Sequence, residues 1–191
     1  MKTLILIFVL LFSYSFADTL KLNTKEILKT HNKLRSIYNS EPLTYSKKLE
    51  KAANKWAKKL QKDGCHMVHS HGKVGDYGEN LFWASPLIRT RTFSNGKKEV
   101  SHSIQTVLEL EVSKAWHDEV QWYNYEDGSC KKGKMCGHFT QLVWDTTKEL
   151  GCAIAICNDK SQVWVCEYYP AGNISLQHVN GTIEKLKPYK K

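Results

Sequence analysis

Six cysteines constrain the fold of this chain more than any other feature of its sequence. They all lie beyond an apolar N-terminal leader, at Cys65, Cys130, Cys136, Cys152, Cys157 and Cys166. An even number of cysteines in an exported chain predicts a disulfide framework, here of three bonds. Six cysteines allow fifteen pairings, and the sequence alone does not choose among them. Zinc-ribbon spacing is excluded because the chain holds no Cys-x-x-Cys pair.

The leader has the features of a secretory signal peptide. Lys2 supplies a positive start, residues 4–12 form an unbroken apolar run, and Ala17 ends a small-x-small cleavage pattern. This run is too short to cross a bilayer, and no later segment is apolar enough to do so. We therefore expect residues 1–17 to be removed and residues 18–191 to form one domain with a short basic C-terminal tail. Its expected location is extracellular, or periplasmic in a bacterium.

The chain is basic, with 28 lysines and arginines against 19 aspartates and glutamates. In an exported protein this excess favours anionic cell-surface or wall components as partners over nucleic acid. Runs such as Lys58-Lys59 and Lys97-Lys98 also fit a solvated face that only aids solubility. The 41% hydrophobic and 25% charged residues are typical of a globular domain, which we expect to be a monomer.

The N-terminal half of the chain predicts helices. Asn23, with Glu26 three residues later, is a plausible N-cap for a helix that reaches about Tyr38. A clearer amphipathic helix ends near Gly64, and its apolar stripe consists of Leu49, Ala52, Ala53, Trp56, Ala57 and Leu60. A third helix is expected from Ser103 or Thr106 to Trp122, with an inward stripe of Val112, Ala115, Trp116, Glu119 and Tyr123.

The C-terminal third has the composition of strands. Residues 139–144, 151–157 and 162–169 are rich in β-branched and aromatic side chains, and the turn at 158–161 joins the last two into a hairpin. This register places Cys152 opposite Cys166, whereas Cys152 and Cys157 point to opposite faces and cannot bond each other. Residues 85–102 are expected to be an exposed loop. Helices followed by antiparallel strands predict an α+β domain.

Few side chains carry obvious chemistry. His66, His69 and His71 crowd six positions and Glu79 follows them, which fits either a divalent metal site or ordinary surface histidines. Glu119 puts an acid on an apolar helix face, where it either reaches solvent or needs a partner. The chain has no Gly-x-Ser-x-Gly elbow and no His-Glu-x-x-His motif, so an enzymatic activity is not indicated.

Four ordered motifs resemble the CAP superfamily of cysteine-rich secretory proteins, antigen 5 and plant pathogenesis-related class 1 proteins. Residues 137–144 (GHFTQLVW) and 163–174 (VWVCEYYPAGNI) resemble its two signatures, and His31-Asn32-x-x-Arg35 and residues 78–81 (GENL) resemble its shorter motifs. The resemblance runs from about Thr24 to Asn173. It implies a three-layer α-β-α sandwich around a central antiparallel sheet.

The resemblance also implies disulfides and a cleft. The cysteine spacing is most similar to the plant-type branch, whose pairing carries over as Cys65–Cys157, Cys130–Cys136 and Cys152–Cys166. The family's cleft of two histidines and two acids carries over as His69, Glu79, Glu119 and His138, which leaves His66 and His71 peripheral. Such a set suits Zn²⁺ or another divalent cation, which is not required for folding and is lost as the histidines protonate.

The implied function is that of a secreted, non-enzymatic binder of sterols or other lipids, connected with defence or host interaction. Trp122, Tyr123 and Tyr125 follow the Glu119 helix and are candidate lipid contacts, although packing alone also explains them. The alternatives are a metal-assisted hydrolase with Glu79 or Glu119 as base, and a basic binder of walls or glycans. The chain departs from the family in its long 85–102 segment and in Glu167, where many members have Asn. Glycosylation sequons occur at Asn173 and Asn180.

Overall fold

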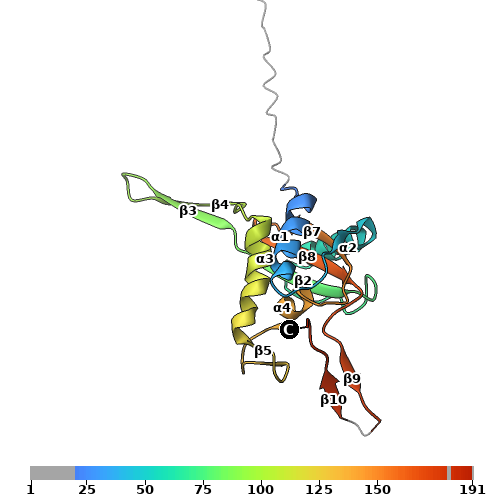
Figure 1. Ribbon diagram of the computed structural model, residues 1–191. Coiled ribbons are helices and arrows are strands. Elements are labelled where there is room, and N and C mark those ends of the chain that lie inside the picture. Colours follow the sequence, from blue (N-terminus) through green and yellow to red (C-terminus); the bar gives the residue numbers. More distant parts are fainter. Residues whose placement is uncertain (1–19, 180–181, 191) are drawn as a thin grey trace, which may run out of the picture.

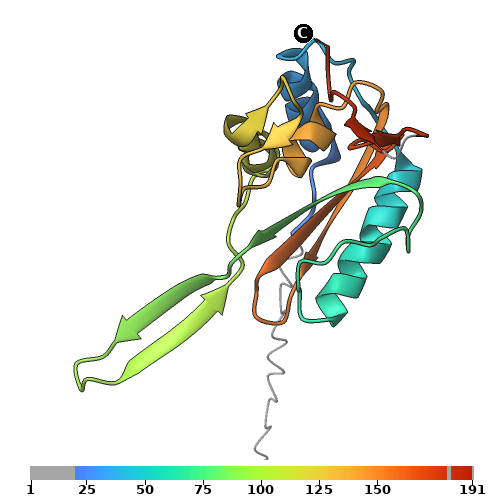
Figure 2. The same ribbon diagram turned by 90° about the horizontal axis from the view of Figure 1, so that it is seen from below.

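The computed structural model describes residues 20–179 and 182–190, so the predicted signal peptide and the Asn180 sequon lie outside the described residues. A central sheet separates two layers of helices. Helix α2 (Lys47–Lys62) covers one face, and α1 (Thr24–Ser36), α3 (Glu109–His117) and α4 (Gly137–Leu142) gather on the other (Figure 1, Figure 2). The predicted α+β sandwich is confirmed.

The sheet has the strand order β1-β7-β8-β2. Strands β2 (Gly78–Ala84), β7 (Glu149–Ile156) and β8 (Gln162–Tyr169) are antiparallel, whereas the short β1 (Thr44–Tyr45) runs parallel to β7. Ile156 pairs with Gln162, as the predicted hairpin register requires, and Cys152 therefore lies opposite Cys166. Strand β2 was not predicted from the sequence, and it pairs with β8 along its whole length.

The side chains of strand β8 alternate between the two faces of the sheet, so they contribute to the hydrophobic core on each face. Val163 and Val165 pack with Trp56 and Leu60 of α2. Trp164 packs instead with the helices of the other layer. The predicted apolar stripe of α2 is entirely buried. The first helix also begins as predicted, since the Asn23 side chain accepts a hydrogen bond of 3.1 Å from the Glu26 amide.

Two predicted elements differ from the structure: the third helix in its extent, and the strand at 139–144 in its type. Helix α3 begins only at Glu109 and passes at Asp118 into a 3₁₀-helix, η1 (Asp118–Trp122). Its buried residues are Val112, Ser113 and Trp116, whereas Ala115, which was expected on the inward stripe, is exposed. The expected strand at 139–144 is largely the helix α4. Tertiary contacts override the strand propensity of its residues, because a carboxylate from η1 accepts hydrogen bonds from its first amides, as described below.

The 85–102 segment is an exposed hairpin instead of a loop. Strands β3 (Leu87–Thr92) and β4 (Lys98–Ser103) form a two-stranded arm that projects from the body (Figure 1, Figure 2). Its turn contains Asn95-Gly96, with Gly96 at φ 80°. This dipeptide is a strong hairpin signal, and it is the feature of the sequence from which the arm could have been predicted.

All six cysteines are paired, as Cys65–Cys157, Cys130–Cys136 and Cys152–Cys166. The pairing implied by the family resemblance is therefore observed. Two short ribbons complete the fold: β5 (Tyr123–Asn124) with β6 (Ser129–Cys130), and β9 (Ser175–Gln177) with β10 (Ile183–Lys185). None of the helices in the described part of the chain is long and apolar enough to span a bilayer.

Candidate functional site

Glu119 and His138 form a partly buried pair between η1 and α4. His138 Nδ1 donates to Glu119 Oε1 at 2.6 Å, and both side chains are largely shielded from solvent. The second oxygen, Glu119 Oε2, accepts from the backbone amides of His138 at 3.0 Å and Phe139 at 3.2 Å. Glu119 thus holds the histidine ring and also caps the first turn of α4, where a negative charge is favourable.

His69 and Glu79 form a second pair at the start of β2. His69 Nδ1 donates to Glu79 Oε1 at 2.6 Å, and the Ser70 amide donates to the same oxygen at 3.0 Å. The hydrogen bond with Glu79 raises the pKa of His69 although partial burial opposes it. Burial alone would raise the pKa of Glu79, but its bonds to His69 and Ser70 hold that pKa below the usual value.

The four predicted cleft residues therefore occur as two His–Glu pairs. Within residues 20–179 and 182–190, no three His, Cys, Asp or Glu side chains lie close enough together to hold a metal ion. In each pair the Nδ1 atom of the histidine is committed to a carboxylate, so a neutral ring keeps its lone pair on Nε2. The two histidines close to His69 in the sequence are His66 and His71. His66 is exposed, and the ring centroid of His71 lies 6.3 Å from that of His69.

A third acid, Glu167, adjoins the second pair, and sequence reasoning did not place it there. Glu79 and Glu167 are direct partners across the β2–β8 ladder. Glu167 is fully buried, and among the described residues both of its carboxyl oxygens and Glu79 Oε2 lack a hydrogen-bond partner. Burial, followed by repulsion from Glu79, raises the pKa of Glu167 to about 9. Glu167 is therefore a neutral carboxylic acid at pH 7.

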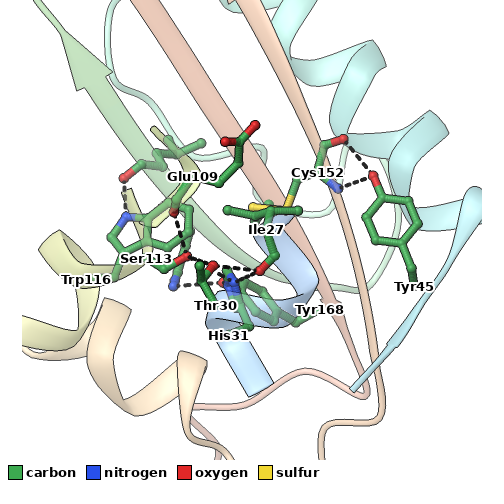
Figure 3. Close-up of a disulfide and its surroundings, with 12 residues drawn as sticks. Ile27, Thr30, His31, Tyr45, Glu109, Ser113, Trp116, Cys152 and Tyr168 are labelled. Atoms are coloured by element: carbon green, nitrogen blue, oxygen red, sulfur yellow. Dashed lines mark hydrogen bonds between the residues drawn. A yellow bond between two sulfur atoms is a disulfide. The ribbon is translucent and has the colours of Figure 1, made fainter. Parts of the chain in front are cut away.

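A buried polar network between the sheet and the helices supports the first pair, and Figure 3 shows its part around His31 and Tyr168. His31 Nδ1 donates to the Ile27 carbonyl at 2.8 Å, which leaves Nε2 to accept from the Tyr168 hydroxyl at 2.9 Å. Asn80 Nδ2 donates to that hydroxyl at 3.2 Å and to the His138 carbonyl at 3.0 Å. The network thus connects α1 through β8 and β2 to the backbone of α4. Burial lowers the pKa of His31 to about 4, so the ring is neutral.

The remaining residues of the first short motif are also structural. Arg35 is fully buried and donates to four main-chain carbonyls, those of Glu41, Leu142, Trp144 and Thr147. The Asn32 side chain exchanges two hydrogen bonds with the backbone of Leu43. These contacts hold the segment after α1 and the segment that begins at the end of α4 against α1, since unsatisfied buried carbonyls are costly.

The three aromatic residues after the Glu119 helix have different surroundings. Tyr123 lines a cavity of about 220 Å³, together with Trp144, Ile174, Leu186 and other residues of α4 and the C-terminal ribbon. Trp122 does not line it, and its ring lies 5.1 Å and 4.6 Å from the ammonium groups of two lysines, Lys131 and Lys134. The ring of Tyr125 packs at a tilt of 36° against that of Tyr189, with a centroid distance of 4.9 Å. Only Tyr123 of the three is placed to meet a ligand in this cavity.

The Asn173 sequon lies on the rim of the same cavity. Its side-chain amide donates to the Gly137 carbonyl at 2.9 Å, and its carbonyl oxygen accepts from the Thr140 hydroxyl. Asn173 adopts φ 56°, a left-handed conformation that asparagine tolerates better than most residues. The amide that would carry a glycan is thus part of the contact between α4 and the segment after β8.

Comparison with known proteins identifies the family to which this chain belongs. The model of the cysteine-rich secretory protein (CAP) family matches residues 28–168. The chain belongs to the CAP family. It is 36% identical to pathogenesis-related protein PRMS of Zea mays over 152 residues, which are 79% of this chain and 78% of the relative. It is 35% identical to pathogenesis-related protein 1A1 of Solanum lycopersicum, over 94% of this chain and 87% of the relative.

Solved structures agree with the fold of this CAP protein. The structure described as NaASP2 with Zn²⁺ matches with a TM-score of 0.58 and 25% identity, covering 88% of this chain and 85% of that one. The hookworm platelet inhibitor matches with a TM-score of 0.61 at 20% identity, covering 88% of this chain and 75% of that one, which shows a common fold. The CAP protein therefore combines the family's fold with a buried Glu167 and an exposed β3–β4 arm.

Proposed function

We propose that this CAP protein is a secreted, non-enzymatic binding protein that holds part of a sterol or another lipid in the cavity beside Tyr123. The cavity carries the proposal: it has about 220 Å³, and aromatic and aliphatic side chains of Tyr123, Trp144, Ile174 and Leu186 line it. Pockets that enclose a whole drug-sized ligand have about 300–1,000 Å³. The cavity therefore suits one end of a lipid, with the rest of the molecule outside.

Secretion and a role in defence or host interaction complete this proposal. The three disulfides support secretion because such bonds persist in oxidising compartments, and the predicted signal peptide agrees with it. Two relatives that resemble the chain over most of its length are pathogenesis-related proteins of plants. We extend that role to this chain as a binder of lipid at a cell surface.

The two His–Glu pairs give this binding protein a means of taking up a divalent cation such as Zn²⁺. Each carboxylate orients its histidine through Nδ1 and leaves Nε2 as the metal ligand, an arrangement common around zinc. Glu79 and Glu119 then act as partners of the ligands and not as ligands themselves. A bound ion would modulate the shape of the cleft.

The same contacts favour binding over hydrolysis. A metal-assisted hydrolase needs a carboxylate that is free to accept a proton from water. Glu79 Oε1 is occupied by His69 and Ser70, and both oxygens of Glu119 accept hydrogen bonds from the start of α4. Glu119 is therefore not available as a general base while its pair persists. The free oxygen of Glu79, Oε2, is buried and so is shielded from a bulk water that it would have to deprotonate.

Titration with a fluorescent sterol and a fluorescent fatty acid tests the lipid site. We expect saturable binding of at least one probe by the wild type and a loss of about tenfold or more in Ile174→Trp, because the larger side chain fills the cavity. Ile37→Trp is the matched control, since Ile37 is exposed and does not line the cavity. An absence of saturable binding, or equal losses in the two variants, would contradict the proposal.

A further inference from the structure

The outer face of α2 carries an uninterrupted row of positive charge. Five exposed lysines follow one another at intervals of three or four residues, which places them on one side of a helix: Lys47, Lys51, Lys55, Lys58 and Lys62. We call this row the α2 lysine stripe. With 16 residues, α2 extends over about 24 Å, so the stripe runs the full length of the helix. Its apolar side is buried against β7 and β8, which holds the stripe in a fixed position.

The stripe is poorly neutralised by the protein itself. Helix α2 contains seven lysines and a single acid, Glu50. Lys47 pairs with Glu50 at 2.8 Å, and Lys59, which lies beside the stripe, pairs with Asp63. In the part of the chain that the structure describes, no carboxylate lies within 4.0 Å of Lys51, Lys55, Lys58 or Lys62. Four adjacent cations are thus left to solvent or to an external partner.

The surface along the stripe is grooved. One groove of about 400 Å³ is lined by Lys47, Glu50, Lys51, Asn54, Lys55 and Lys58. A second, of about 420 Å³, continues toward the end of the helix and shares Lys55 and Lys58 with the first. The ammonium group of Lys73, from the loop after α2, lies in this second groove, 5.7 Å from the ring of Trp56. The two grooves therefore adjoin at Lys55 and Lys58, and we refer to them together as the channel.

We infer that this channel binds a linear anionic polysaccharide, whose carboxylate or sulfate groups lie along the α2 lysine stripe. Successive lysines are separated by about 4.5–6 Å along the helix axis, a spacing comparable with one sugar unit. Each exposed ion pair is weak, but several pairs made by one polymer act together, as in other multivalent binding. The shallow channel matches an extended chain that lies flat on the surface.

Membranes and nucleic acids fit this surface less well. A helix that binds a bilayer inserts apolar side chains, but the apolar face of α2 is buried and none of its residues is an exposed large hydrophobic. Binding of single-stranded nucleic acid usually uses exposed aromatic rings on which bases stack. Trp56 is the only aromatic residue of α2, and it is 5% exposed. The exposed side chains of α2 along the stripe are therefore mainly cationic, and apolar groups reach only the second groove, through Trp56 and Val74.

Calorimetric titration at two salt concentrations tests this inference with polygalacturonate, dextran sulfate and neutral dextran. The key variant is Lys51→Gln/Lys55→Gln/Lys58→Gln/Lys62→Gln, in which glutamine preserves helix propensity. The matched control, Arg89→Gln/Arg91→Gln/Lys97→Gln/Lys98→Gln, removes the same charge from the β3–β4 arm. We expect one or both anionic polymers to bind the wild type, with affinity falling as salt rises. The stripe variant should lose about tenfold or more in affinity and most of the salt dependence, whereas the arm variant should lose little.

The two anionic polymers show whether carboxylate or sulfate is preferred, and either preference supports the inference. Equal losses in the two variants would overturn it, because binding would then follow net charge alone. Failure of both polymers to bind at low salt, or equal binding of neutral dextran, would overturn it as well. So would tighter binding through the stripe to phosphatidylserine vesicles or to a DNA oligonucleotide. The lipid cavity is lined by other residues, so the result of the sterol titration is independent of this test.

Discussion

Replacement of Glu167 by glutamine should stabilise this protein at neutral pH, although it removes a buried native side chain. Glu167 lies fully buried beside Glu79, and its pKa rises from 4.5 to about 9 on folding. Above pH 4.5 the unfolded chain releases a proton that the folded chain keeps, so folding becomes less favourable as the pH rises. The penalty begins near pH 4.5 and grows until about pH 9.

The size of this penalty follows from the pKa difference. Each pH unit between the two values costs about 1.4 kcal/mol, so at pH 7 the buried acid reduces stability by the order of 3 kcal/mol. Glutamine has nearly the same shape and no charge at any pH. Its amide can donate to Glu79 Oε2, as the neutral carboxyl group of Glu167 can, so the substitution keeps this contact. We expect Glu167→Gln to exceed the wild type by about 3 kcal/mol at pH 7 and to approach it near pH 4.5.

Urea unfolding followed by tryptophan fluorescence at pH 4.5, 7 and 8.5, with disulfides intact, measures the difference. Glu99→Gln makes the same chemical change on the exposed arm and should remain within about 0.5 kcal/mol of the wild type. The reasoning would be refuted if the free energy of unfolding changed with pH in the same way for Glu167→Gln and for the wild type. That result would mean that Glu167 is ionised in the folded protein and that a cation compensates its charge.

Two further predictions concern the metal and the core. Zn²⁺ at about 100 times its Kd should raise the Tm by about 5–10 °C at pH 7.5, and by less near pH 5 because protonated histidines do not bind metal. Scanning fluorimetry should show that this increase in Tm is lost in His69→Ala/His138→Ala and kept in His66→Ala/His71→Ala. Arg35→Met should lower the free energy of unfolding, measured in urea, by about 3 kcal/mol or more, because four main-chain carbonyls lose their hydrogen-bond donor. A loss below about 1 kcal/mol would show that water replaces the guanidinium group.

Several elements of the fold were predictable because their determinants are local. The apolar stripe of α2 repeats with the helical period, and the Asn23 cap acts on an amide three residues away. The β7–β8 register follows from the short turn between the strands, so the Cys152–Cys166 bond follows as well. In each case the deciding residues are neighbours in sequence, and their geometry is set by the backbone alone.

Elements decided by distant contacts were not predictable in this way. Residues 139–144 have strand-like composition, yet most of them are helical because Glu119, about twenty residues earlier, caps their first amides. The third helix ends as a 3₁₀ turn, which brings Glu119 to this position. Local propensity is worth less than these partly buried, charge-assisted hydrogen bonds, so tertiary context decided the type of element.

The sequence, through its family motifs, predicted that His69, Glu79, Glu119 and His138 act together in a cleft, but it did not predict how they pair. The tertiary structure decided that His69 contacts Glu79 and that His138 contacts Glu119. It alone also showed that Glu167 lies beside Glu79, because that neighbour comes from the register of β2 against β8, two strands far apart in the chain. The pKa of a carboxyl group depends on what surrounds it in space, so only the folded protein makes Glu167 a neutral acid.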